Sequence, residues 1–369
     1  MEGLTKRENE ILQLLKSDPT ISREIIAEKL GISDSAVGTH IHNLNQKGYL
    51  LGRGYIIAPR EEVVIIGGSN IDLKGYTDSY INNTSNPGQI MESLGGVGRN
   101  IAENLAILGR EVVFLTAVGN DHYGEKIIED TAEAGVNMEF AKKVDNKKTG
   151  IYLAHLDQNG ELVGAISDMH ILDEITPEYI KKHIQIIKQS STLVLDMNLK
   201  PEVIKGIFDY IKGDSLKVIV EPVSLEKAKK AKLFLRKIDY ITPNIDEAEI
   251  LLGLKVCSEK SLDWRKERLV KAYNQLENPP AMIITCGEKG VLVITESVSQ
   301  LLPGTHIPVS EIKETTGAGD AFTAGLIEGL LNGKGLIKSV RLGMKAAEIT
   351  ICTNSTVNSN LAHELKSND

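Results

Sequence analysis

The 369-residue chain has few cysteines, few aromatic residues and no long apolar run. Its three cysteines, Cys257, Cys286 and Cys352, are far apart and odd in number, which excludes a disulfide framework and a Cys-x-x-Cys metal pair. No run approaches the ~18 apolar residues of a membrane span, and the N-terminal residues lack the apolar stretch of a signal peptide. We therefore expect a cytoplasmic protein with no membrane partner.

The chain is 41% hydrophobic and carries a net charge of −8, which excludes a disordered chain and predicts a well-filled core. At about 100–200 residues per domain, its length suggests two domains. The sequence pattern changes after Pro59. We therefore expect domains at residues 1–59 and 60–369.

Residues 1–59 predict three helices followed by a short hairpin. Thr5, Ser22 and Ser33 are suited to cap the three helices, and Gly31 ends the second. The tight connection before the third helix is typical of a helix-turn-helix. With the predicted hairpin over residues 49–57, this domain resembles the winged helix-turn-helix of bacterial transcription regulators.

The third predicted helix carries polar side chains that can reach DNA bases or phosphates: Ser35, Thr39, His40, His42 and Asn43. However, the domain holds seven basic and seven acidic residues, so it lacks the basic surface usual for DNA binding. DNA binding by a dimer is the favoured interpretation. A protein-contact or dimerisation module is the alternative.

After residue 60, buried-type strands alternate with amphipathic helices. This alternation predicts a doubly wound α/β/α sandwich with a parallel sheet. Two strand-like segments within residues 149–167 flank Asn159-Gly160, a strong hairpin signal. A hairpin inserted into such a domain predicts a small β lid over the site.

The segment Thr316-Gly317-Ala318-Gly319-Asp320 is the most informative part of the sequence. A glycine-rich turn at the start of a helix leaves main-chain amides free to bind a phosphoryl group. A carboxylate there is unexpected for simple anion binding, but a base that deprotonates an acceptor hydroxyl explains it.

This segment resembles the C-terminal signature of the ribokinase-like (PfkB) carbohydrate kinases, and residues 95–100 resemble their N-terminal signature. The resemblance implies an ATP-dependent phosphotransferase with an alcohol acceptor. Asp320 would be the catalytic base, and Gly317, Ala318 and Gly319 would stabilise the phosphoryl charge. The chain contains no Walker A motif.

The resemblance also assigns the remaining site residues. Asn70, Asp72, Gly96, Asn100 and Asn198 would bind the acceptor sugar. Asn244 and Glu247 would orient Mg²⁺ through water. The nucleotide would contact Asn244, Glu247, Thr285, Gly287, Gly290, Thr316 and Asn358. Arg99 would either contact phosphate or lie on the outside of its helix.

Structural interpretations of some of these residues remain open. Asp72 could be an ordinary turn residue, and Asn244 with Glu247 could form a helix cap. Glu314 stands where the family usually has Asp, beside a loop that binds a monovalent cation in many members. The need for such a cation is therefore left open.

Several segments, including residues 67–75, 95–105 and 165–169, are most similar to pseudouridine kinases. This similarity implies phosphorylation of the 5′-hydroxyl of pseudouridine, with Lys74 and Asp168 beside the uracil ring or on a solvent-facing lid. The alternatives are a ribokinase- or fructokinase-like sugar kinase and a transcriptional regulator that uses the fold as a sugar or nucleoside sensor. A homodimer is expected in each case.

Overall fold

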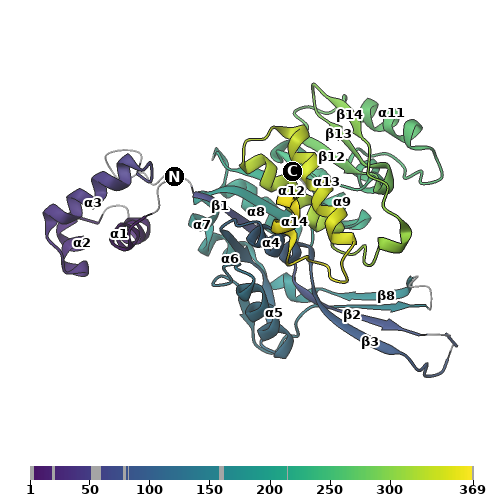
Figure 1. Ribbon diagram of the computed structural model, residues 1–369, viewed down its shortest axis with the longest axis horizontal. Coiled ribbons are helices and arrows are strands. Elements are labelled where there is room, and N and C mark those ends of the chain that lie inside the picture. The colour runs from purple at the N-terminus through teal and green to yellow at the C-terminus, as the bar shows by residue number, and fades with distance from the viewer. Residues whose placement is uncertain are drawn as a thin grey trace. The chain divides into compact units, whose positions relative to one another are not determined.

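The chain divides into two units, Met1–Arg60 and Glu61–Asp369, in the computed structural model shown in Figure 1. The structure describes residues 4–18, 21–50, 60–77, 80–81, 83–157, 162–213 and 215–367. No helix in these ranges is long and apolar enough to cross a membrane.

The first unit has three helices, α1 (Lys6–Ser17), α2 (Arg23–Leu30) and α3 (Asp34–Gln46). The predicted caps are confirmed, because Thr5, Ser22 and Ser33 each accept a hydrogen bond from an amide in the first turn of the following helix. Gly31, at the C-cap of α2, has a φ of 63°, the left-handed conformation that glycine adopts most readily.

The helices enclose a small aliphatic core: Ile11, Leu12, Leu15, Ile21, Ile26, Val37, Leu44 and Leu50. Glu8 is also buried, and Lys47 Nζ donates to its carboxylate at 2.9 Å, joining the start of α1 to the end of α3. A hydrogen bond from the Thr5 amide and this ion pair lower the pKa of Glu8 to about 2. Most of the predicted hairpin at 49–57 lies outside the described residues.

The second unit is built on an eight-stranded sheet with the order β14-β13-β12-β11-β10-β9-β1-β4. Four strand pairs, β1–β4, β9–β10, β10–β11 and β11–β12, are parallel, whereas β12–β13 and β13–β14 are antiparallel. The strands are β1 (Arg60–Ile66), β4 (Val112–Leu115), β9 (Ser190–Asp196), β10 (Lys217–Glu221), β11 (Tyr240–Ile241), β12 (Ala281–Thr285), β13 (Val291–Ile294) and β14 (Ser299–Leu302).

Helices cover both faces of this sheet. Alternate residues of a strand point to opposite faces, and in β1 the residues on both faces are buried and apolar. Val64 and Ile66 belong to a core cluster that includes residues of α6 to α11, whereas Val63 and Ile65 belong to a cluster that includes residues of α4 and α12. The helices are α4 (Val97–Ile107), α5 (His122–Glu133), α6 (Pro177–Lys182), α7 (Ile184–Gln189), α8 (Pro201–Tyr210), α9 (Leu225–Ala231), α10 (Ile245–Leu251), α11 (Leu262–Tyr273), α12 (Ala318–Leu331), α13 (Leu336–Ile351) and α14 (Leu361–Ser367). This is the predicted three-layer α/β/α sandwich.

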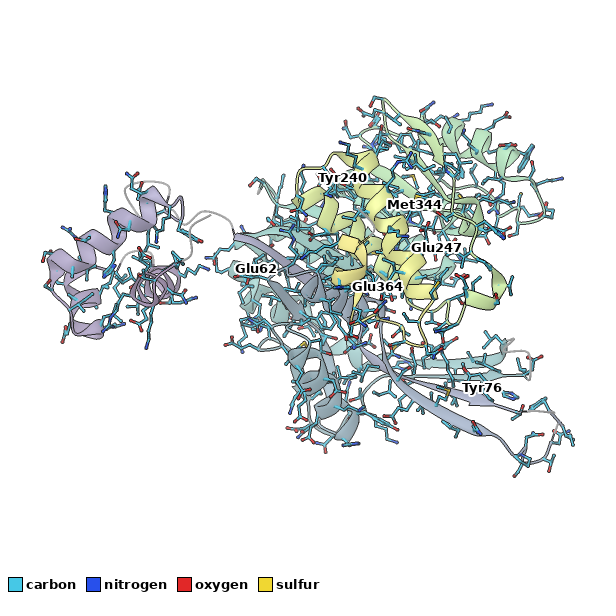
Figure 2. All side chains as sticks on the ribbon, in the orientation of Figure 1. Glu62, Tyr76, Tyr240, Glu247, Met344 and Glu364 are labelled. Atoms are coloured by element: carbon cyan, nitrogen blue, oxygen red, sulfur yellow. The ribbon has the colours of Figure 1, made fainter. Side chains whose placement is uncertain are left out.

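A second sheet, with the order β3-β2-β7-β8, extends from the body of the unit (Figure 1). Its strands are β2 (Asn70–Tyr76), β3 (Gln89–Gly95), β7 (Ile151–Leu156) and β8 (Leu162–Asp168), and Figure 2 labels Tyr76 at the end of β2. The lid is thus larger than the hairpin expected from the sequence, because β2 and β3 form its other half. A short parallel pair, β5 (Ala117–Gly119) with β6 (Lys142–Val144), completes the strands.

Candidate active site

The glycine-rich turn before α12 is open on one side. Gly317 has a φ of 87°, and a Cβ there would lie 2.1 Å from the carbonyl oxygen of Thr356, so the turn needs glycine. Beside Gly319 a Cβ would meet nothing within 4 Å. The Ala318 amide donates to the Thr315 carbonyl at 3.3 Å, which leaves the next amides of the first turn without a partner inside the helix. The turn therefore offers main-chain donors to an anion.

Asp320 lies in the first turn of α12 and is 8% exposed. Its Oδ2 accepts a hydrogen bond from Asn100 Nδ2 at 2.8 Å, and Arg99 Nη1 donates to Asn100 Oδ1 at 2.9 Å. Burial, together with the charges of Asp196 and Asp72, raises the pKa of Asp320 to about 7, although the Asn100 bond opposes this shift. A carboxylate with this pKa is suited to accept a proton near neutral pH.

Arg99 does not lie on the outside of its helix, which was one of the two places expected for it. Its side chain is buried between α4 and α5, where Nε donates to Thr131 Oγ1 at 3.3 Å and Nη2 forms an ion pair with Glu103. Its guanidinium therefore orients Asn100 and does not face the open turn.

Asp196 at the end of β9 is a central residue that sequence reasoning did not assign. It is fully buried, and its Oδ2 accepts hydrogen bonds from the amides of Gly68 at 2.6 Å and Gly98 at 3.0 Å. Its Oδ1 accepts the amide of Asn198 at 2.9 Å. One carboxylate thus holds three loops together at the carboxyl edge of the sheet, where such folds bind ligands.

Asn70 and Asp72 lie together on β2, so Asp72 is a strand residue and not a turn residue. Asn70 Nδ2 donates to Asp72 Oδ1 at 2.6 Å, and both side chains are buried. Burial raises the pKa of Asp72. Glycines allow the close approach of the neighbouring loop, because a Cβ at Gly95 would lie 2.4 Å from Asp72 Oδ2 and one at Gly96 would lie 2.5 Å from the Gly68 carbonyl.

Lys74 lies two residues further along β2, on the same face as Asp72. Its ammonium forms an ion pair with Glu314 and donates to Thr316 Oγ1 at 3.3 Å. Glu314 Oε1 in turn accepts the Thr316 amide at 2.9 Å. Lys74 therefore connects the lid to the residues that lead into the glycine-rich turn.

Asn244 and Glu247 form a capping box at the start of α10. Asn244 Oδ1 accepts the Glu247 amide, and Glu247 Oε2 accepts the Asn244 amide, both at 2.9 Å. The Thr285 amide donates to the Pro243 carbonyl at 2.9 Å, so the end of β12 lies beside this helix start. The structure thus brings Asn244, Glu247 and Thr285 together. It also shows that Asn244 and Glu247 cap α10, the structural alternative considered for them.

Glu221 is a second carboxylate that sequence reasoning missed, at the end of β10. Thr242 Oγ1 donates to its Oε2 at 2.6 Å, and so does Thr323 Oγ1 at 3.1 Å. Burial and the charges of Glu247 and Asp320 raise the pKa of Glu221 well above its ordinary value. Glu247 and Asp320 thus both act on the ionisation of Glu221.

Residues 60–363 match the pfkB family carbohydrate kinases, and residues 7–57 match an HTH domain. The chain belongs to the pfkB family. This confirms the family and the class of activity expected from the sequence, that of an ATP-dependent kinase.

Two relatives of this pfkB kinase come from Escherichia coli strain K12. The uncharacterized sugar kinase YeiI is 34% identical over 97% of this chain and 97% of its own length. A pseudouridine kinase is 34% identical over 82% of this chain and 94% of its own length.

Solved structures confirm the ribokinase-like fold of this pfkB kinase. A carbohydrate kinase from Agrobacterium tumefaciens is 28% identical, with a TM-score of 0.69 over 84% of this chain and 96% of its own. A ribokinase from Arabidopsis thaliana, 20% identical, also has a TM-score of 0.69, over 84% of this chain and 99% of its own, which shows the fold alone.

Asp168 and Asn358, two residues expected at the site of this pfkB kinase, form hydrogen bonds with neighbouring residues of the chain. In the lid register Tyr152 pairs with both Asp72 and Ser167, so Asp168 lies on the opposite face and bonds to His170 at 2.8 Å. Asn358 is buried, and its side chain contacts the Asn360 amide and Glu364. Asp168 therefore lies exposed on the lid, as in the solvent-facing alternative, and Asn358 is held by residues of its own C-terminal segment.

The glycines after β12 shape a tight turn in this pfkB kinase. Gly290 has a φ of 100°, and a Cβ there would lie 2.0 Å from the Leu302 carbonyl. At Gly287, where φ is 59°, nothing lies within 4 Å of a Cβ. The turn therefore has free space beside Gly287, whereas Gly290 is packed against the backbone of Leu302.

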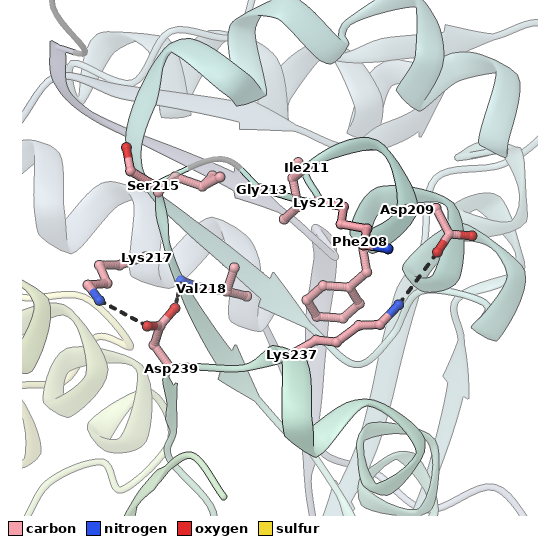
Figure 3. Close-up of a pocket in the computed structure, with 11 residues that line it drawn as sticks. Phe208, Asp209, Ile211, Lys212, Gly213, Ser215, Lys217, Val218, Lys237 and Asp239 are labelled. Carbon is pink, nitrogen blue, oxygen red and sulfur yellow. Dashed lines mark hydrogen bonds and ion pairs between the residues drawn. The ribbon is translucent and has the colours of Figure 1, made fainter. Parts of the chain in front are cut away.

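A separate pocket of about 520 Å³ lies elsewhere in this unit (Figure 3). Its lining includes Lys217 and Asp239, which form an ion pair at 3.0 Å, and Lys237 with Asp209 at 3.5 Å. Lys217 begins β10, whereas the carboxylates of the site follow the carboxyl ends of strands. The pocket is therefore at the opposite edge of the sheet from Asp320.

The HTH domain places its predicted DNA contacts on two sides of α3. Ser35, Thr39 and His42 are exposed, and Asn43 is half-buried. His40 is half-buried, and its Nδ1 is buried without a hydrogen-bond partner. Its spacing from Val37 and Leu44 puts His40 on the core side of the helix.

Proposed function

We propose that this pfkB kinase transfers the γ-phosphoryl group of ATP to the 5′-hydroxyl of pseudouridine, giving pseudouridine 5′-phosphate and ADP. The main supporting observation is Asp320, a buried carboxylate with a pKa of about 7 beside an open glycine-rich turn. The 34% identity to a pseudouridine kinase supports the choice of acceptor.

In the proposed mechanism, Asp320 takes the proton of the 5′-hydroxyl as that oxygen attacks the γ-phosphorus. The bond from phosphorus to the bridging oxygen breaks, and ADP leaves. Amides of the Gly317–Gly319 turn stabilise the charge on the phosphoryl oxygens. Asn70 and Asp72 hold ribose hydroxyls, since a carboxylate accepts hydrogen bonds from two hydroxyls in a defined geometry. Thr285 and Thr316 bind the nucleotide.

Mg²⁺ fits the carboxylates at this site. Burial and the charges of Glu247 and Asp320 raise the pKa of Glu221 well above its ordinary value, and a divalent cation would relieve the repulsion among these charges. Among the described residues no three His, Cys, Asp or Glu side chains are grouped as direct ligands. We therefore assign Glu247, with Asn244, to orient Mg²⁺ through water, and add Glu221 to this set. The bound ion would neutralise charge on the phosphates.

A substrate panel tests the acceptor. The full-length protein is assayed with ATP and Mg²⁺ against pseudouridine, uridine, ribose and fructose. We expect kcat/KM to be highest for pseudouridine. A preference for ribose or fructose would replace this proposal with the sugar kinase alternative.

We further propose that the HTH domain binds DNA as a homodimer. The exposed side chains of Ser35, Thr39 and His42 supply polar contacts, and the E. coli sugar kinase YeiI aligns over this domain as well.

Exposed apolar side chains on the lid, including Ile90 and Ile166, offer a dimer surface. A gel-shift assay with the DNA upstream of the gene, with and without nucleoside, tests this function. Absence of binding at low salt and at dimer-forming concentration would overturn it.

A further inference from the structure

Asn198 is held in one orientation at the carboxyl edge of the sheet. Its amide N–H donates to Asp196, and its side-chain Oδ1 accepts a hydrogen bond from Lys227 Nζ on α9. A lysine ammonium has three donors and no acceptor, so the amide atom beside it must be the oxygen. Nδ2 of Asn198 therefore faces away from Lys227.

The Nδ2 atom faces Gly68, in the loop that leads into the acceptor-binding strand β2. A Cβ at Gly68 would lie 3.1 Å from Asn198 Nδ2 and 3.1 Å from Met169 Cε. No hydrogen-bond acceptor for this Nδ2 is found in the described part of the chain, and the atom is not among the buried orphaned ones. Asn198 thus presents a free N–H donor beside Gly68, which stands two residues before Asn70 in the sequence.

We propose that Lys227 is a positioning residue for acceptor specificity: it fixes the Asn198 amide so that Nδ2 donates to a carbonyl oxygen on the base of a nucleoside acceptor. This inference rests on the proposed function. The consecutive residues Gly95 and Gly96 approach Asp72 and Gly68, respectively, so Gly68 lies close to Asp72. In this proposal the ribose hydroxyls lie at Asp72 and the base extends toward Gly68 and Asn198.

The N–H donor of Asn198 favours bases that present a hydrogen-bond acceptor at this position. Uracil presents two carbonyl oxygens, whereas cytosine has an exocyclic amino group in place of one of them and adenine has an amino group and no carbonyl oxygen. An amino group opposite Asn198 Nδ2 would place donor against donor and leave both unpaired. The site therefore favours a uracil-type base.

Replacement of Lys227 tests this. Lys227→Met keeps the length of the side chain but frees the Asn198 amide to rotate. We expect KM for pseudouridine to rise about 10-fold, with kcat within about twofold of the wild type, and discrimination against cytidine to fall. Lys227→Arg, which keeps a donor, should restore much of the selectivity.

Lys230 supplies a matched control. It lies on the same helix, is also half-buried, and donates to the Leu199 carbonyl at 2.8 Å without touching Asn198. Lys230→Met should leave the ratio of kcat/KM values for pseudouridine and cytidine unchanged. Asn198→Asp, which replaces the donor by an acceptor while keeping a partner for Lys227, should raise KM for pseudouridine further.

The outcomes separate this inference from the proposed function. If the wild type phosphorylates pseudouridine but Lys227→Met keeps its KM and selectivity, or Lys230→Met has the same effect, the role of Lys227 is wrong and the function stands. If the wild type phosphorylates only free sugars, the proposed function fails, and the inference fails with it.

Discussion

Lys74 on the lid and Glu314 before the glycine-rich turn form an ion pair although they are 240 positions apart in the sequence. Both side chains are mostly shielded from solvent, at 13% and 21% exposure. The pair ties β2, which carries Asp72, to the turn that carries Thr316. The strand proposed to bind the acceptor and the turn proposed to bind phosphate are thus physically connected.

Lys74→Met should weaken ATP binding. Without its partner, the Glu314 carboxylate repels the nucleotide phosphates, and the lid loses its tie to the turn. We expect KM for ATP to rise about 10-fold, a change of ~1.4 kcal/mol. Steady-state kinetics measure this. The double variant with Glu314→Gln should be less impaired than the sum of the two single variants. An unchanged KM for ATP would show that the pair has no part in nucleotide binding.

Activity should depend little on potassium. The Lys74 ammonium already neutralises Glu314, so a monovalent cation beside this carboxylate is not required. Assays in potassium, sodium and tetramethylammonium salts at equal ionic strength should give rates within about twofold of one another. In Lys74→Met, potassium should partly restore activity. Strong activation of the wild type by potassium alone would contradict this prediction.

Asp320→Asn should remove most of the turnover and leave acceptor binding intact. Loss of a general base costs about 10²–10⁴-fold in rate. In the wild type, kcat/KM should rise with pH through about 7 and then level off, because the carboxylate must be ionised to take a proton. Calorimetric titration with pseudouridine supplies the binding control. Near-normal turnover in the variant would remove Asp320 from this role.

The same substitution should change stability in a pH-dependent way. Because the pKa of Asp320 is raised from 3.8 to about 7 in the folded state, its stabilising contribution is fully present only below pH 3.8 and is lost as the pH rises from there through about 7. Asp320→Asn should therefore raise the melting temperature more at pH 8.5 than at pH 5. Equal effects at both pH values would contradict a buried, ionising carboxylate.

Asn100→Ala separates two possible roles of Asn100. The hydrogen bond from its side chain lowers the pKa of Asp320, so its loss should move the acid limb of the pH profile to higher pH. A contact with the sugar would instead raise the acceptor KM at every pH. An unshifted acid limb with a raised KM would assign Asn100 to the sugar alone.

Local sequence signals predicted much of this structure. Helix caps, alternating strands and the glycine-rich turn depend on neighbouring residues, so Ser33, Gly317 and Asp320 could be placed without coordinates. His40 could also have been placed, since its spacing from Val37 is that of one helix face.

Long-range relationships could not be predicted in this way. Asp196 binds amides 98 and 128 positions away, and no local pattern distinguishes it from an ordinary residue after a strand. Lys227 acts through Asn198, which is 29 positions away. The face of the lid on which Asp168 lies depends on the strand register, because a shift of one residue exchanges the two faces of a sheet.

The two histidines of α3 should respond differently to replacement. His42 is exposed beside Thr39, whereas His40 faces the core with its Nδ1 buried. His42→Ala should weaken binding to an operator by about 10-fold, the scale of one lost base contact, and leave the melting temperature unchanged. His40→Ala should alter the melting temperature of the HTH domain more than its sequence preference. Fluorescence anisotropy with labelled promoter DNA, beside thermal unfolding of the full chain, measures both. If His40→Ala weakened binding more than His42→Ala without a change in stability, the helix would present a different face to DNA.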